Sequence, residues 1–136
     1  MRRVGFFDEF VTGARGDGSI SAVVRATSRA LEPDLVRYLR SGYVVVDVME
    51  IRPDVLDGTP LVETGSLMTD GSWYWREDLA HYVEKYHLEL PRAFEEHVAF
   101  NEFLVPARDE AALVAATNSI VSNWSAESGR VVPQAN

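Results

Sequence analysis

Three histidines and the acids near them are the side chains in this sequence best suited to metal or acid–base chemistry. Glu84 and His87 have the spacing Glu-x-x-His, which places both side chains on one edge of a helix. Di-iron helical bundles use this spacing, but they need a second such pair and two further acids. We therefore predict neither a metal nor a cofactor, and we expect His81, His87 and His97 to be surface residues or to have internal partners.

The sequence carries no linear signature of a hydrolase or of a nucleotide-binding protein. It has no cysteine and no Gly-x-Ser-x-Gly motif, and its glycine-rich stretch at 12–18 lacks the Gly-Lys-Ser/Thr ending of a phosphate loop. Asp47, inside an apolar strand pattern, is either a buried acid with a raised pKa or an acid paired to an arginine or to loop amides. A small enzyme or ligand-binding domain stays open as an alternative, with a pocket near Trp73, Trp75, Asp47 and His81.

A predicted hairpin carries large aromatic side chains toward both faces of a sheet. Asp70-Gly71 is the strongest turn signal in the sequence. A two-residue loop there would pair Met68 with Trp73 and Leu67 with Tyr74, so that the two faces both receive aromatic residues. Such a hairpin is either covered by helices on both sides or leaves one aromatic face open to a partner.

Apolar periodicity predicts the elements that position these residues. We expect strands at 43–51, 62–69 and 72–75 and helices near 33–41, 77–87, 91–103 and 109–124. The first strand is apolar on both alternating faces, which favours an interior position in the sheet. The prediction is a single α+β domain over residues 1–136, with a small antiparallel sheet of three to four strands packed by three to five helices.

The two ends of the chain are expected to be less regular than its centre. Residues 1–18 are predicted to be a loop-rich arm held to the body by Phe6, Phe7 and Phe10, and residues 126–136 a flexible tail. The helix before the tail has an apolar stripe that could cover the sheet or form a structural homodimer. The residues of that stripe are Leu113, Thr117, Ile120, Val121 and Trp124.

The charge of the chain is unevenly distributed. Residues 1–40 hold seven arginines and five acids, a net charge of +2, so residues 41–136 carry −10 and the whole chain −8. An acidic body repels phosphate backbones, so we expect no nucleic acid as a ligand and, if any, a basic protein partner. No apolar run approaches the roughly 18 residues of a membrane span, and Asp8 and Glu9 interrupt any signal peptide; the expected location is the cytoplasm.

The hairpin and the helix after it resemble a signature of small uncharacterised proteins of actinobacterial type. The matching residues are Leu67-Met68-Thr69-Asp70-Gly71-x-Trp73-x-Trp75-x-x-Asp78-Leu79-Ala80-x-Tyr82-Val83-x-x-Tyr86-His87-x-x-Leu90-Pro91-x-x-Phe94-x-x-His97. With Tyr38-Leu39-Arg40-Ser41-Gly42, the resemblance covers roughly residues 35–98; Arg76 departs from it, because the family tends to have proline there. The resemblance implies no established activity. In size, acidity and fold pattern the chain is similar to small α+β immunity proteins that neutralise bacterial toxins.

The function that these observations predict is a non-enzymatic protein-binding module, immunity-like or regulatory, with a basic protein partner. The acidic region 77–102, beside an open aromatic face of the hairpin, would steer the partner by charge and hold it by aromatic contacts. The residues expected at that surface are Trp73, Trp75, Glu77, His81, Glu84, Glu95 and Glu96.

Overall fold

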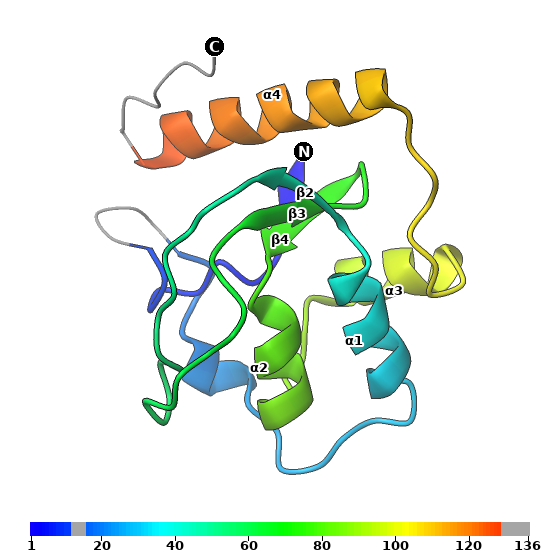
Figure 1. The fold of residues 1–136 in the computed structure, drawn as a ribbon. Helices are drawn as coiled ribbons and strands as arrows, with labels where there is room; N and C mark the ends of the chain where they lie inside the picture. The colour runs from blue at the N-terminus through cyan, green and yellow to red at the C-terminus, as the bar shows by residue number, and fades with distance from the viewer. Residues whose placement is uncertain (12–15, 129–136) are drawn as a thin grey trace.

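Four strands form the central sheet of the computed structural model, which describes residues 1–11 and 16–128 (Figure 1). The strands are β1 (Arg2–Arg3), β2 (Tyr43–Val46), β3 (Leu67–Thr69) and β4 (Trp73–Arg76), in the spatial order β1-β4-β3-β2. The predicted α+β single domain is confirmed. The sheet is mixed rather than antiparallel, because the N-terminal arm contributes β1, which runs parallel to β4.

Helices cover both faces of the sheet (Figure 1). On one face lie α1 (Glu32–Arg40), α2 (Leu79–Tyr86) and α3 (Arg92–Phe100); α4 (Glu110–Ser128) lies along the other, and a short 3₁₀ helix, η1 (Ile20–Val23), precedes α1. Two clusters of buried side chains follow from this arrangement. The predicted stripe of α4 faces the sheet through the buried Ile120, whereas the side chain of Trp124 lies outside the described part of the chain.

The aromatic residues of the hairpin are explained by these two layers. Trp73 and Trp75 belong to the larger core, on the side of the first three helices. Tyr74 points the other way and packs with Phe6, whose ring centroid lies 5.3 Å from that of Tyr74, and with Ile120 of α4. The hairpin is therefore covered on both sides, and the alternative of an open aromatic face does not hold.

The hairpin turn lies one residue further along the chain than predicted. The observed pairs are Leu67 with Arg76, Met68 with Trp75 and Thr69 with Tyr74. The carboxylate of Asp70 accepts hydrogen bonds from the backbone N–H groups of Ser72 and Trp73, both at 2.8 Å, so Asp70 opens the turn and Gly71 and Ser72 form its tip. Because each partner moves by two residues, every side chain keeps its predicted face.

β2 lies at the edge of the sheet and ends at Val46, so the interior strand predicted over 43–51 is wrong. Its pairing with β3 becomes irregular between Val44 and Val46. Beyond that point the N–H of Val48 donates to the side chain of Ser66, at 2.9 Å, instead of to a neighbouring strand. The strand predicted at 62–69 is shortened to 67–69 for the same reason.

The two ends of α2 are fixed by Asp78 at its start and by His87 after its last residue. Asp78 occupies the N-cap position but makes no capping hydrogen bond; its carboxylate accepts two from the guanidinium of Arg76, at 3.0 and 2.9 Å. The helix stops where His87 adopts a left-handed conformation, with φ of 55°, and its N–H donates to the carbonyl of Val83 at 2.9 Å. Asp78 therefore links the end of β4 to the start of α2 through its bonds with Arg76.

The N-terminal arm is held to the body as predicted, because Phe6, Phe7 and Phe10 are all buried. Residues 12–15 of its glycine-rich stretch and residues 129–136 of the predicted tail lie outside the described residues, and α4 continues to Ser128. Among the described helices, none combines the length and the apolar character that a membrane crossing requires.

Candidate functional site

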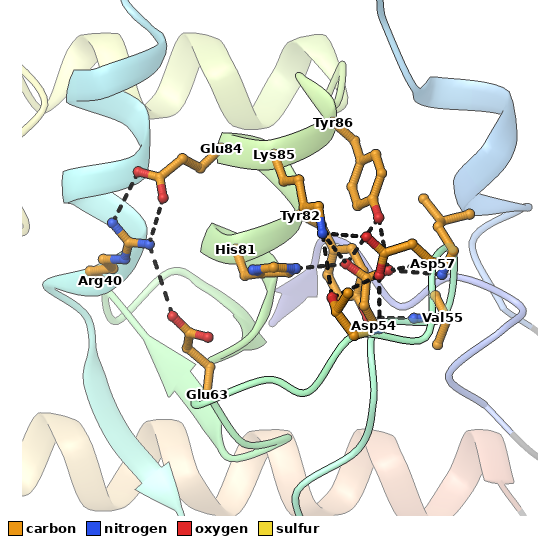
Figure 2. A network of polar contacts seen from close by, with 12 residues as sticks. Arg40, Asp54, Val55, Asp57, Glu63, His81, Tyr82, Glu84, Lys85 and Tyr86 are labelled. Carbon is orange, nitrogen blue, oxygen red and sulfur yellow. Dashed lines mark hydrogen bonds and ion pairs between the residues drawn. The ribbon is translucent and has the colours of Figure 1, made fainter.

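Arginines from the first forty residues neutralise much of the acidic region 77–102. The ion pairs are Arg25 with Glu89, Arg29 with Glu95 and Arg40 with Glu84. The last pair, at 3.2 Å, is seen in Figure 2, where Arg40 also approaches Glu63 at 3.9 Å. Part of the charge asymmetry of the sequence is therefore used in ion pairs between residues 77–102 and the first forty residues. Exposed pairs of this kind each contribute only about 0–1 kcal/mol.

A groove of about 810 Å³ lies between the start of α1 and α3. Its apolar wall consists of Ala30, Leu31, Leu35, Leu90, Ala99 and Phe103. Leu31 is 55% exposed and Ala30 and Ala99 are also exposed, whereas Leu35 and Leu90 are buried, each at 3% exposure. Both the volume and the apolar lining are typical of sites that bury part of a ligand.

The charged residues of the groove are mostly acidic. They are Glu32, Glu89, Glu95, Glu96, Arg29 and Arg92, and these four glutamates and two arginines give a formal charge of −2. Arg29 is engaged by Glu95 and by the carbonyl of Leu88, and Arg92 by Glu96 at 2.8 Å. The glutamates also have partners, because Glu89 pairs with Arg25 and Glu32 with His87, so the preference for a cationic ligand rests on the formal charge of −2 and on the unpaired oxygen of Glu32.

A second polar cluster connects the long segment between β2 and β3 to α2 (Figure 2). At its centre is Asp54, whose side chain is 0% exposed. Its carboxylate pairs with Nε2 of His81 at 2.8 Å and accepts hydrogen bonds from the Tyr86 hydroxyl at 3.0 Å and from the N–H groups of Leu56 at 2.8 Å and Asp57 at 3.2 Å. Figure 2 shows His81 and Tyr86 on either side of this carboxylate, and with the two backbone amides they leave it no free acceptor position.

The electrostatics of this cluster favour one fixed protonation state. Burial alone would raise the pKa of Asp54, but the hydrogen bonds from His81 and from two backbone amides outweigh it, and the pKa is lowered. Burial raises the pKa of Tyr82 to about 12, and burial together with Asp54 raises the pKa of Tyr86. An ionised, saturated carboxylate among neutral phenols is suited to holding the loop on the helix, and it is poorly suited to accepting a proton in a reaction.

The same arrangement recurs around each histidine, because all three contact a buried carboxylate. His97 lies 2.7 Å from Asp70, which also accepts a hydrogen bond from the Tyr38 hydroxyl at 2.5 Å. Burial and the bond to Asp70 raise the pKa of Tyr38, whereas the hydrogen bonds to Asp70 lower the pKa of that carboxyl against its burial. His87 lies 2.7 Å from Glu32. The expectation that histidines have internal partners is confirmed for all three.

The residues predicted to bind a partner are not brought together at one place. Trp73 and Trp75 are 5% and 0% exposed, and Trp75 donates its indole N–H to the Leu39 carbonyl at 3.0 Å, so neither offers a contact surface in this conformation. Glu77 accepts from the N–H of Thr64 at 2.9 Å. His81 and Glu84 lie in the network of Figure 2. Only Glu95 and Glu96 line the groove.

Asp47 has no role in a pocket with His81. The residue is exposed, and its carboxylate accepts one hydrogen bond, from Ser66 at 3.2 Å. His81 is engaged with a different acid, Asp54. The interpretation of Asp47 as a buried acid is therefore wrong, because the strand ends one residue before Asp47 and leaves it at the surface.

Sequence reasoning missed Glu32, Leu31 and Phe103, which the fold brings to the groove. Glu32 is an acid in the first turn of α1, a common position for acids, and no linear signal shows that it is buried. Glu84 and His87 pair with Arg40 and with Glu32, respectively. Within residues 1–11 and 16–128 no three His, Asp or Glu side chains are grouped as a metal ion would require.

No protein-family model matches the chain, and no curated protein or solved structure matches it either.

Proposed function

We propose that the protein is a non-enzymatic binding module, immunity-like or regulatory, whose partner is a basic protein with an amphipathic segment that docks between α1 and α3. The observation that carries this proposal is the groove itself, with an apolar wall and more carboxylates than arginines along it. In place of the aromatic contacts expected from Trp73 and Trp75, the groove offers the 55% exposed side chain of Leu31 together with Ala30 and Ala99, which are also exposed.

Two large apolar side chains that are next in sequence to groove residues are strongly exposed. Phe100 is 86% exposed and Leu104 64% exposed, and they are the sequence neighbours of the groove residues Ala99 and Phe103. Large apolar side chains next to a charged rim are typical of interaction sites. Removing such surface from water stabilises a complex by about 25 cal/mol per Å² of apolar area.

Charge complementarity supports a basic partner rather than an acidic one. The chain has a formal charge of −8, and the groove carries −2 after its own arginines are counted. A cationic segment would be steered toward this face and would bind less tightly as salt screens the attraction over a Debye length of roughly 8–10 Å. The apolar part of the contact would persist at high salt.

A pair of matched variants tests the proposal. Leu31→Ser removes an apolar contact in the groove, and Val114→Ser removes a side chain of nearly equal exposure, 55% against 53%, on the outer part of α4. Leu31 is the N-cap residue of α1, a position that favours serine, so the variant should fold. Wild type and both variants are immobilised, the proteins that they capture from host extract are identified, and the affinities are measured with purified partner.

The proposal predicts a basic protein that binds wild type and V114S within about twofold, and L31S about 5- to 30-fold more weakly, for a loss of about 1–2 kcal/mol. Binding should weaken between low and high salt. Equal affinity for L31S and V114S, or a partner with an acidic surface, would contradict the proposal.

A further inference from the structure

Glu32 is the one buried carboxylate among the groove residues, and only one of its two oxygens has a hydrogen-bond partner among the described residues. Its side chain is 6% exposed, and its Oε1 pairs with Nδ1 of His87 at 2.7 Å. The second oxygen, Oε2, is buried and accepts no hydrogen bond from the described residues. With Glu32 ionised, His87 must carry its proton on Nδ1, so the pair holds the carboxylate in place while Oε2 remains without a donor.

The contrast with the other buried acids makes this oxygen unusual. Asp54 is bonded by His81, Tyr86 and two backbone amides, and Asp70 by His97, Tyr38 and two backbone amides. Buried carboxylate oxygens are normally satisfied, because an unpaired one loses its hydration without compensation. Glu32 therefore stands apart, and it is also the one of the three that lines the groove.

We propose that docking uncovers Oε2 of Glu32, which is buried in the unbound protein, and that this oxygen then accepts from a lysine ammonium of the docked segment, so that the groove selects lysine at that position. This inference rests on the proposed function, because it names the side chain that the groove recognises in its basic partner. Leu31, the residue before Glu32, lines the groove and is 55% exposed, so it offers an apolar contact for the four-carbon stem of a lysine.

The geometry favours lysine over arginine. A guanidinium binds a carboxylate best through two parallel hydrogen bonds, which need both oxygens. His87 occupies Oε1, so a single acceptor remains, and an ammonium can use it as a point charge. The other cations at the groove, Arg29 and Arg92, are engaged by Glu95 and Glu96 and do not fill this position.

The test uses the full chain and three small probes: Nα-acetyl-lysine methylamide and its arginine and norleucine analogues. Blocking the α-amine leaves the side chain as the only cation. Each probe is titrated into ¹⁵N-labelled wild type and Glu32→Gln, and binding is followed by amide shifts in residues 30–35 and 99–103 and by the ring nitrogens of His87. The His87 signals report directly on the carboxylate that it shares with the probe.

We expect saturable binding of the lysine probe to wild type, with a shift of the His87 ring nitrogens. Binding should be at least about tenfold weaker for the arginine and norleucine probes, and for E32Q with the lysine probe, since a hydrogen bond to a charged group is lost. An amide spectrum of E32Q that matches wild type away from Glu32 shows that the variant is folded; if it does not match, the His87 shift and the probe selectivity in wild type decide the outcome.

Three results would overturn the inference: equal affinity of wild type and folded E32Q, equal affinity for the lysine and norleucine probes, or binding without a change at His87. None of them would remove the groove proposal, because Leu31→Ser tests that separately. Conversely, the lysine probe could bind selectively through Glu32 while a basic partner binds L31S as tightly as wild type. That result would support the ammonium site and contradict the proposed function.

Discussion

Replacing Asp54 by asparagine tests how strongly the charge at the centre of the α2 network stabilises the fold. The two residues are nearly equal in size, so the substitution changes charge and hydrogen bonding with little change in packing. The asparagine oxygen can still accept from the N–H groups of Leu56 and Asp57, which both bond Oδ1. The loss falls on the contacts with His81 and Tyr86.

The expected magnitude follows from those two contacts. A hydrogen bond to a charged group contributes about 1.5–3 kcal/mol, and the new amide group can recover part of this by donating to the Tyr86 oxygen. We therefore expect D54N to lower the free energy of unfolding by about 2–3 kcal/mol at neutral pH. The substitution Asp47→Asn is the matched control, because that acid is exposed and accepts a single 3.2 Å bond; it should stay within about 0.5 kcal/mol of wild type.

The difference between wild type and D54N should depend on pH in one direction. The pKa of Asp54 is lower in the folded than in the unfolded chain, so its stabilisation is fully present above the unfolded pKa near 3.9 and is lost as pH falls through the folded value. Asparagine does not titrate, so the part of the D54N deficit that comes from the Asp54 charge should shrink below about pH 4.

Urea unfolding followed by circular dichroism, at several pH values, measures both effects in the three proteins. The slope of the free energy against urea should be the same for all of them, because the surface exposed on unfolding does not change. A D54N deficit below 0.5 kcal/mol, a deficit as large at pH 3 as at pH 7, or an equal deficit in D47N would refute the role assigned to this carboxylate.

Two further substitutions test the hairpin and its core. Trp75→Phe removes the indole N–H that donates to the Leu39 carbonyl at 3.0 Å and leaves a cavity beside a fully buried side chain, so thermal or urea unfolding should show a loss of about 2–4 kcal/mol. Gly71→Ala places a Cβ against the side chain of Arg108 at a backbone φ of +99°, and it should cost about 1–2 kcal/mol by the same measurement; a stability equal to wild type would contradict the turn described here.

Local signals carried most of the predictions that hold. Apolar periodicity located the helices, and the Asp70-Gly71 pair located the hairpin, because both patterns depend on neighbouring residues. The register differed because the Asp70 side chain bonds Ser72 and Trp73 and so opens the turn one residue later, a choice that the dipeptide alone does not reveal. The side chains kept their predicted faces since alternation has a period of two.

Features that depend on distant parts of the chain could not be read in the same way. Strand order decides whether a strand is at the edge: in the described sheet β2 pairs with β3 alone, and the remaining strand, β1, pairs with β4 on the opposite side. The acids at Glu95 and Glu96 were expected at a binding surface, but the groove also needs α1, and Arg29 meets Glu95 across 66 residues of sequence. Burial of Glu32 depends on the same long-range packing.

The groove between α1 and α3 is the central claim, and the most direct measurement is the footprint of a basic amphipathic partner on the ¹⁵N-labelled protein. On addition of the captured partner, the largest amide shifts should fall in residues 30–35 and 89–103, and those of Val114 and of the segment around Asp54 should stay unchanged. Shifts concentrated on α4, on β2 or around Asp54, with none at Leu31 or Ala99, would contradict the account.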